Sequence, residues 1–131
     1  MLAFFIIKEE IMGVEEKSFQ LYKDINYIGY LYVCKGKNDY VKRANNLLPQ
    51  IQEFVQWFLA GNQFGIEDEV YQALQQNLLV ILEDIATALK ENDSVLMLDA
   101  LEQGISEYLL MFIPEEFLEQ EREKVHDGSV E

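Results

Sequence analysis

The strongest constraint on the fold of this chain is the stretch Val70–Ile113, where apolar residues recur at steps of three and four. Such spacing places apolar side chains along one face of an amphipathic helix. The polar turn Glu91–Ser94 separates two runs of this kind, and short connections favour antiparallel helices. This stretch therefore predicts an αα-hairpin. The first run contains Val70, Leu74, Leu78, Ile81, Ile85 and Leu89, and the second contains Leu98, Leu101, Ile105, Tyr108 and Phe112.

Two further helices are expected before this hairpin, over residues 14–35 and 38–60, each with apolar residues at helical spacing. Either Asn38 or Asp39 suits the N-cap of the second helix. Pro49 lies inside that helix and removes one backbone hydrogen bond, so we expect a kink near Asn45–Asn46 or a new helix start.

These patterns predict one all-α domain over residues 1–131, an antiparallel up-and-down four-helix bundle with a short C-terminal helix. A frayed tail is expected from residue 125. The four principal helices are expected at 14–35, 38–60, 67–91 and 94–112.

Two segments allow alternative interpretations. Asn26–Cys34 is rich in residues that favour strands, but no second strand-like run is present to pair with it, so we favour helix. Lys8–Met12 can be encoded by a purine-rich ribosome-binding sequence followed by a start codon. Residues 1–11 are therefore interpreted either as a translated leader before a native start at Met12, or as a helix or strand that packs on the core.

Acidic residues dominate the charge of the chain, with 24 acidic and 10 basic residues and a formal net charge of −14. This charge repels nucleic-acid phosphates and anionic membrane surfaces. No apolar run approaches the ~20 residues of a membrane helix. We expect neither nucleic acid nor membrane as a partner. The densest basic group is too small for a nucleic-acid-binding stripe and is interrupted by Asp39; it contains Lys35, Lys37, Lys42 and Arg43.

The chain has one cysteine, Cys34, and one histidine, His126. An intramolecular disulfide, a Cys/His zinc site and a Ser-His-Asp constellation are therefore excluded within one chain. No cofactor is expected, and a reducing cytoplasm is the simplest compartment.

Four carboxylates are weak candidates for a metal site, because helical bundles bind metals through inward-facing acidic residues. They are Glu83 and Asp84 in the third expected helix and Asp99 and Glu102 in the fourth. Asp99 and Glu102 each directly follow a leucine of the core stripe, which turns them towards the edge of that stripe. We expect them on a solvated face.

The tyrosine content is the most informative anomaly, with seven tyrosines in the chain and five of them between residues 22 and 40. Tyr27 and Tyr30 are expected to lie off the core face of the first helix. Together with Tyr40 they are candidates for a partner surface or a homodimer contact, because aromatic residues are enriched at interfaces. The alternative is core packing with hydroxyls that reach water.

A helix at Leu79–Leu89 followed by the pattern Asp93…Asp99-x-Leu101-Glu102 resembles small uncharacterised all-helical proteins of Gram-positive bacteria. The resemblance covers about a third of the chain. It implies a helical bundle with no assigned reaction. In that pattern Asp93 suits an N-cap.

From these features we expect a non-enzymatic interaction module, such as a cytoplasmic adaptor, regulator or chaperone-like bundle with a protein partner. The alternative is a carboxylate-dependent metal hydrolase that uses Glu83, Asp84, Asp99 and Glu102. An acidic decoy of a nucleic-acid-binding protein also fits the charge, but it requires a clustered negative face.

Overall fold

The computed structural model describes the backbone of residues 2–130 and the side chains of residues 13–123. Every regular element within residues 2–130 is helical, which confirms the all-α class. The elements are α1 (Leu2–Val33), α2 (Tyr40–Asn46), α3 (Leu48–Leu59), α4 (Asp68–Glu91), α5 (Ser94–Asp99), the π-helical segment η1 (Ala100–Ile105), α6 (Ser106–Leu110) and α7 (Glu115–Val130).

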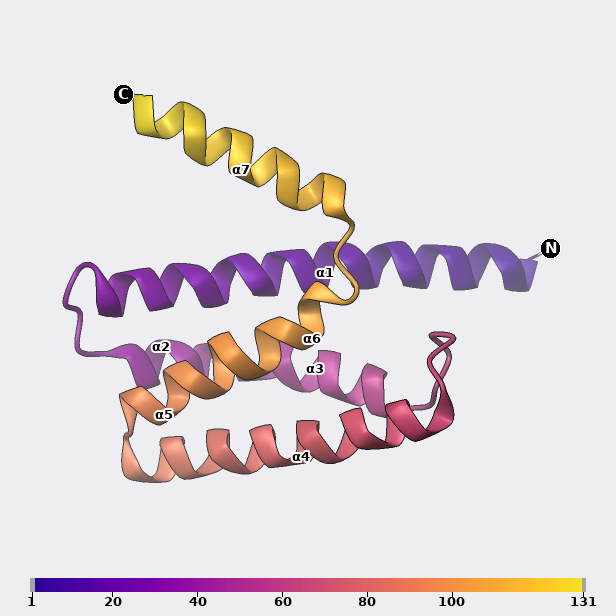
Figure 1. Cartoon of the computed structure of the whole chain (residues 1–131), viewed down its shortest axis with the longest axis horizontal. Helices are drawn as coiled ribbons and strands as arrows, with labels where there is room; N and C mark the ends of the chain where they lie inside the picture. The colour runs from indigo at the N-terminus through magenta and orange to yellow at the C-terminus, as the bar shows by residue number, and fades with distance from the viewer. Residues whose placement is uncertain (1, 131) are drawn as a thin grey trace.

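Figure 1 shows the arrangement of these elements. The helix α1 spans the length of the molecule, α2 and α3 return below it, and α4 lies along the bottom edge. The run α5–η1–α6 then crosses from α4 up to α1, and it contacts both of them. The helix α7 leads away above α1, with Phe117 packed against Phe19 at a ring-centroid distance of 5.4 Å.

The segment Asn26–Cys34, for which helix and strand were both possible, is helical to Val33, because α1 is continuous there. Helix is therefore the correct interpretation there, and no strand partner is needed. The helix begins at Leu2, before the expected start at residue 14. The proposals of a leader at 1–11 and of a frayed tail at 125–131 fall on residues whose side chains lie outside the described part, so both stay predictions.

The helix expected over 38–60 is divided at Leu47 into α2 and α3. Pro49 lies in the first turn of α3, where its fixed φ suits a helix and its missing N–H leaves no hydrogen bond unmade. The new helix start is thus the outcome found, and the physical reason is the proline. Asp39 occupies the N-cap position of α2, but its side chain makes no capping hydrogen bond.

The hairpin α4–α5 closes as expected. Asn92 takes a left-handed conformation with φ 53° at the end of α4. Asp93 then caps α5, accepting a hydrogen bond of 3.0 Å from the backbone N–H of Leu96. The helix expected over 94–112 is regular only in α5 and α6, because η1 between them is a wide π turn.

Two glycines allow η1 to pack closely on both sides. A Cβ at Gly29 of α1 would overlap the Glu102 carboxylate of η1 and lie 3.6 Å from Leu98 Cδ1. A Cβ at Gly104 of η1 would lie 3.0 Å from Ile81 Cγ2 of α4. Larger residues at these two positions would push η1 away from α1 and from α4.

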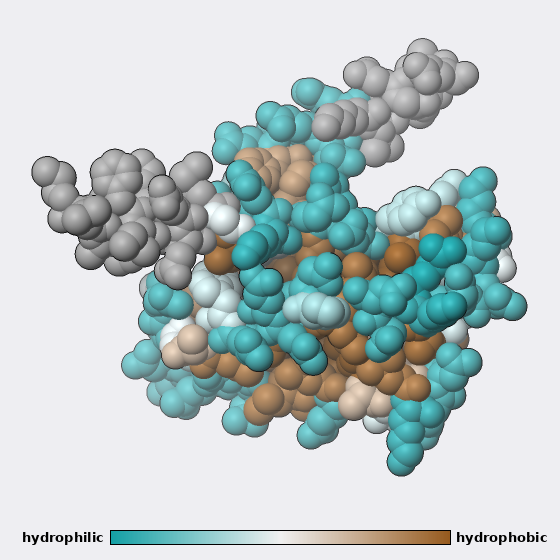
Figure 2. All heavy atoms as spheres, turned by 180° about the vertical axis from the view of Figure 1, so that it is seen from behind, coloured by the Kyte–Doolittle hydropathy of each residue, from teal (hydrophilic) through white to brown (hydrophobic). Residues whose placement is uncertain are grey.

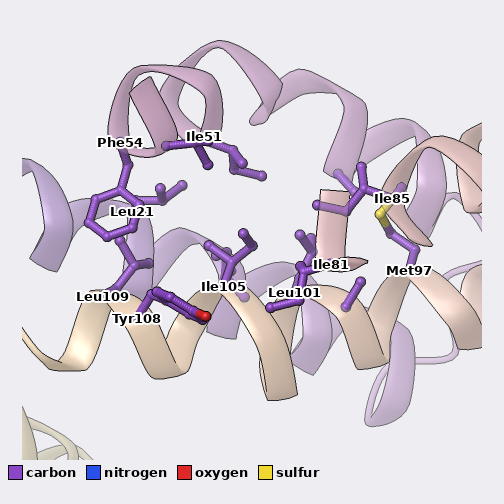
Figure 3. Packing of buried hydrophobic residues seen from close by; sticks show 14 of the residues in the cluster. Leu21, Ile51, Phe54, Ile81, Ile85, Met97, Leu101, Ile105, Tyr108 and Leu109 are labelled. Carbon is purple, nitrogen blue, oxygen red and sulfur yellow. The ribbon is translucent and has the colours of Figure 1, made fainter. Parts of the chain in front are cut away.

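The hydrophobic core lies where α1, α3, α4 and α5–η1–α6 face one another. Figure 3 shows side chains from these elements pointing into a shared interior, with Leu21 beside Phe54 and Ile81 beside Leu101. One end of this core is aromatic, and Trp57 of α3 contacts Phe112 with ring centroids 4.9 Å apart.

Candidate interaction surface

An exposed apolar stripe runs along the C-terminal half of α1. Tyr27, Tyr30 and Val33 lie three residues apart and expose 59%, 47% and 65% of their surface. The opposite face of the same helix is buried, with Ile25 and Ile28 in the core. The phase of the helix therefore directs these three side chains outward, as the sequence predicted for the two tyrosines. Val33 was missed, although its spacing from Tyr30 was a usable signal.

Tyr40 does not belong to this surface, and the prediction that placed it there was wrong. It is fully buried in the first turn of α2, where its ring stacks on Tyr32 at 5.2 Å. Its hydroxyl has no hydrogen-bond partner. Burial, with additional contributions from nearby Glu102 and Tyr32, raises the pKa of the Tyr40 hydroxyl well above its ordinary value. Tyr40 therefore packs α2 against α1, and its side chain is not accessible to a partner.

The stripe borders the basic residues of the α1–α2 turn. Lys35 Nζ lies 5.9 Å from the centroid of the Tyr30 ring, within cation–π range. Arg43 donates a hydrogen bond of 2.8 Å from Nε to Asp39, and this bond lowers the pKa of the Asp39 carboxyl. The same bond raises the pKa of Arg43. Lys35 is thus the basic residue whose contact with the tyrosine stripe is shown by geometry.

We call this region the tyrosine-basic corner. Cys34 is also exposed there, next to Val33. The corner consists of Tyr27, Tyr30, Val33, Lys35, Lys37, Asp39, Lys42 and Arg43.

The four carboxylates proposed as metal ligands do not form a metal site. Among the described side chains, no group of three or more His, Cys, Asp or Glu residues is placed to hold an ion. Glu83 and Asp99 are exposed and Asp84 is half-buried. Only Glu102 is distinctive, because it lies over Gly29 at the crossing of α1 and η1, and burial raises the pKa of its carboxyl.

A groove of about 690 Å³ separates α1 from α3. Its apolar walls include Leu21, Phe54 and Trp57. Lys17 and Glu53 form an ion pair of 2.5 Å between the two helices, and both side chains stay largely exposed. Figure 2 shows the molecule from behind, where hydrophobic surface lies open between hydrophilic side chains. No sequence pattern indicates this groove, because side chains of two helices far apart in the sequence line it.

No protein-family model matches this sequence, and neither the curated proteins nor the solved structures that were compared with it give a match. The resemblance to helical proteins of Gram-positive bacteria therefore stays a prediction. Within the described part of the chain, no helix has the length and apolar character required to cross a bilayer.

Proposed function

We propose that this chain is a non-enzymatic protein–protein interaction module, acting in the cytoplasm as an adaptor, regulator or chaperone-like bundle. The observation that carries the proposal is the exposed stripe of Tyr27, Tyr30 and Val33. Exposed side chains of this size are costly to leave in water, and tyrosine is enriched where proteins bind one another. A protein partner, or a second copy of the chain in a homodimer, would bind at this surface.

The proposed scaffold is an antiparallel up-and-down four-helix bundle, with α2–α3 as its second member and α5–η1–α6 as its fourth. The contacts between elements support it. The helix α1 contacts α2 and α3, α2 contacts α4, and α4 contacts α5 and η1. The elements α6 and η1 in turn contact α1, so the fourth member of the proposed bundle packs on the first. A rigid bundle would hold the stripe of α1 in a fixed geometry, which reduces the entropy lost on binding.

The carboxylate-dependent hydrolase is not proposed further, because no observation favours it. Its four candidate residues do not converge among the described side chains. Glu102, which is half-buried, lies against Gly29 of α1.

Light scattering on the purified chain tests the homodimer form of this proposal. If the stripe joins two copies, the wild type is a dimer and Tyr27→Ser/Tyr30→Ser shifts it to monomer. The matched control is Leu79→Ser/Val80→Ser on α4, which removes two similarly exposed apolar side chains and should leave the dimer intact. A wild type that stays monomeric at all concentrations contradicts the homodimer.

A further inference from the structure

We propose that the tyrosine-basic corner binds an acidic segment of another protein that also carries apolar anchor residues. This inference rests on the proposed interaction function and specifies the chemistry of the partner. Exposed tyrosines and basic side chains lie together at one end of α1.

The local charge is opposite to that of the whole chain. Four basic residues and one carboxylate give residues 35–43, the α1–α2 turn and the start of α2, a net charge of +3, while the chain carries −14. The single carboxylate, Asp39, is already paired with Arg43. Lys35, Lys37 and Lys42 are exposed and free to meet carboxylates of a partner. A negative segment is therefore attracted to this corner and repelled by most of the remaining surface.

The tyrosines supply the apolar component of the contact. Tyr27 and Tyr30 lie about one turn apart on α1, and Lys35 Nζ lies within cation–π range of the Tyr30 ring. An aliphatic or aromatic side chain packed on these rings excludes water from the neighbouring ion pairs, which strengthens them. Such a partner buries its apolar residues on the stripe while its carboxylates reach the turn.

A nucleic acid offers negative charge and bases that stack on tyrosine, so it needs to be distinguished from a peptide. The acidic remainder of this chain repels a long polyanion, whereas a short peptide meets only the corner. The Debye length is about 8 Å at physiological salt, so a compact contact of this kind escapes most of that repulsion. The charge distribution thus favours a protein segment.

The test uses fluorescence anisotropy with the full chain and three labelled probes. These are a peptide with glutamate and leucine at helical spacing, the same peptide with lysine in place of glutamate, and an oligothymidine. The glutamate peptide should bind best, and binding should weaken as salt rises. Equal or tighter binding of the lysine peptide or the oligothymidine overturns the inference.

Charge-reversing variants separate the effect of charge from that of the apolar surface. Lys35→Glu/Lys42→Glu should weaken binding of the glutamate peptide about tenfold or more, the ratio that corresponds to about 1.4 kcal/mol. Lys42→Glu alone at the corner and Arg122→Glu alone on α7 make the same change in net charge, and Arg122→Glu should weaken binding less than Lys42→Glu does. Circular dichroism should show that these substitutions, which fall on exposed side chains, leave the helices intact.

The outcomes also distinguish this inference from the function on which it rests. If Tyr27→Ser/Tyr30→Ser abolishes binding of both peptides while the lysine variants have no effect, the interaction surface stands and the acidic partner is wrong. If no probe binds and the tyrosine variant matches the wild type in light scattering as well, both proposals fail.

Discussion

Among the described carboxylates, Glu102 is one whose surroundings differ clearly from water. It is half-buried at the crossing of η1 and α1, with Gly29 leaving the space that it occupies. Burial penalises its charged form, and it has no cation as a hydrogen-bond partner among the described side chains. Its carboxylate therefore opposes folding when it is ionised.

We predict that Glu102→Gln stabilises the protein at neutral pH. The folded-state pKa of Glu102 is raised above its unfolded value, so the folded wild type is penalised above that pKa and is relieved as pH falls through it. The stability advantage of the variant should thus be present at pH 7 and disappear in acid, as measured by thermal unfolding across pH. Glu107→Gln, at an exposed position of α6, controls for the change in net charge. A variant less stable than wild type at pH 7 contradicts the prediction.

The sequence predicts the exposure of a tyrosine correctly where helical phase determines it. It does not predict exposure where packing by another helix determines it. Tyr27 and Tyr30 could be placed outside because each lies off the apolar stripe of its own helix. Tyr40 is the first residue of α2, so no apolar stripe on the preceding turn shows which way its side chain faces. The contact of its ring with Tyr32 of α1 buries it.

At the scale of single elements, the N-terminus of α5 depends on one side chain. Asp93 satisfies a backbone donor of the first turn, whereas Asp39 occupies the same position of α2 without capping it. Substitution of the two aspartates therefore allows the contribution of a capping hydrogen bond to stability to be measured.

We predict that Asp93→Ala lowers the free energy of unfolding by about 1 kcal/mol, the usual loss for a capping residue. Asp39→Ala should cost less than Asp93→Ala does, because it removes only a surface ion pair with Arg43. Urea denaturation of both variants gives the comparison. Equal losses, or a larger loss for Asp39→Ala, would show that the hydrogen bond to Leu96 contributes little.

The helix boundaries illustrate what local sequence could and could not supply. Pro49 indicates the start of α3, because its fixed φ and missing N–H affect the helix within the turn that contains it. The π turn of η1 has no comparable local signal. It results from how the fourth helix fits between α1 and α4, where Gly29 and Gly104 permit close approach.

At the scale of the whole molecule, buried tyrosines join distant elements. Tyr71 of α4 donates a hydrogen bond of 2.6 Å to the Phe58 carbonyl, which lies in the last turn of α3 and has no partner within that helix. Tyr108 of α6 donates one of 2.6 Å to the Leu74 carbonyl of α4. These bonds tie the aromatic end of the core together.

We predict that Tyr71→Phe and Tyr108→Phe each lower the free energy of unfolding by about 1 kcal/mol. Tyr40→Phe should be neutral or stabilising, because it removes a buried hydroxyl that has no partner. Chemical denaturation of the three variants measures the contrast. A Tyr40→Phe variant that loses as much stability as the other two would refute it.

The π turn of η1 holds one residue more than an α-helical turn would. Deleting one residue from residues 100–105 would therefore convert this segment into a regular α-helix, and α6 would keep its direction relative to α5. Tyr108 and Leu109 would stay in the interior, and the bond of Tyr108 to Leu74 would be kept. Deleting one residue from the regular helix α4 would instead rotate the side chains that follow by about 100° and turn its apolar face out of the core. Of the helical segments, residues 100–105 are thus the place where the chain tolerates the loss of one residue best.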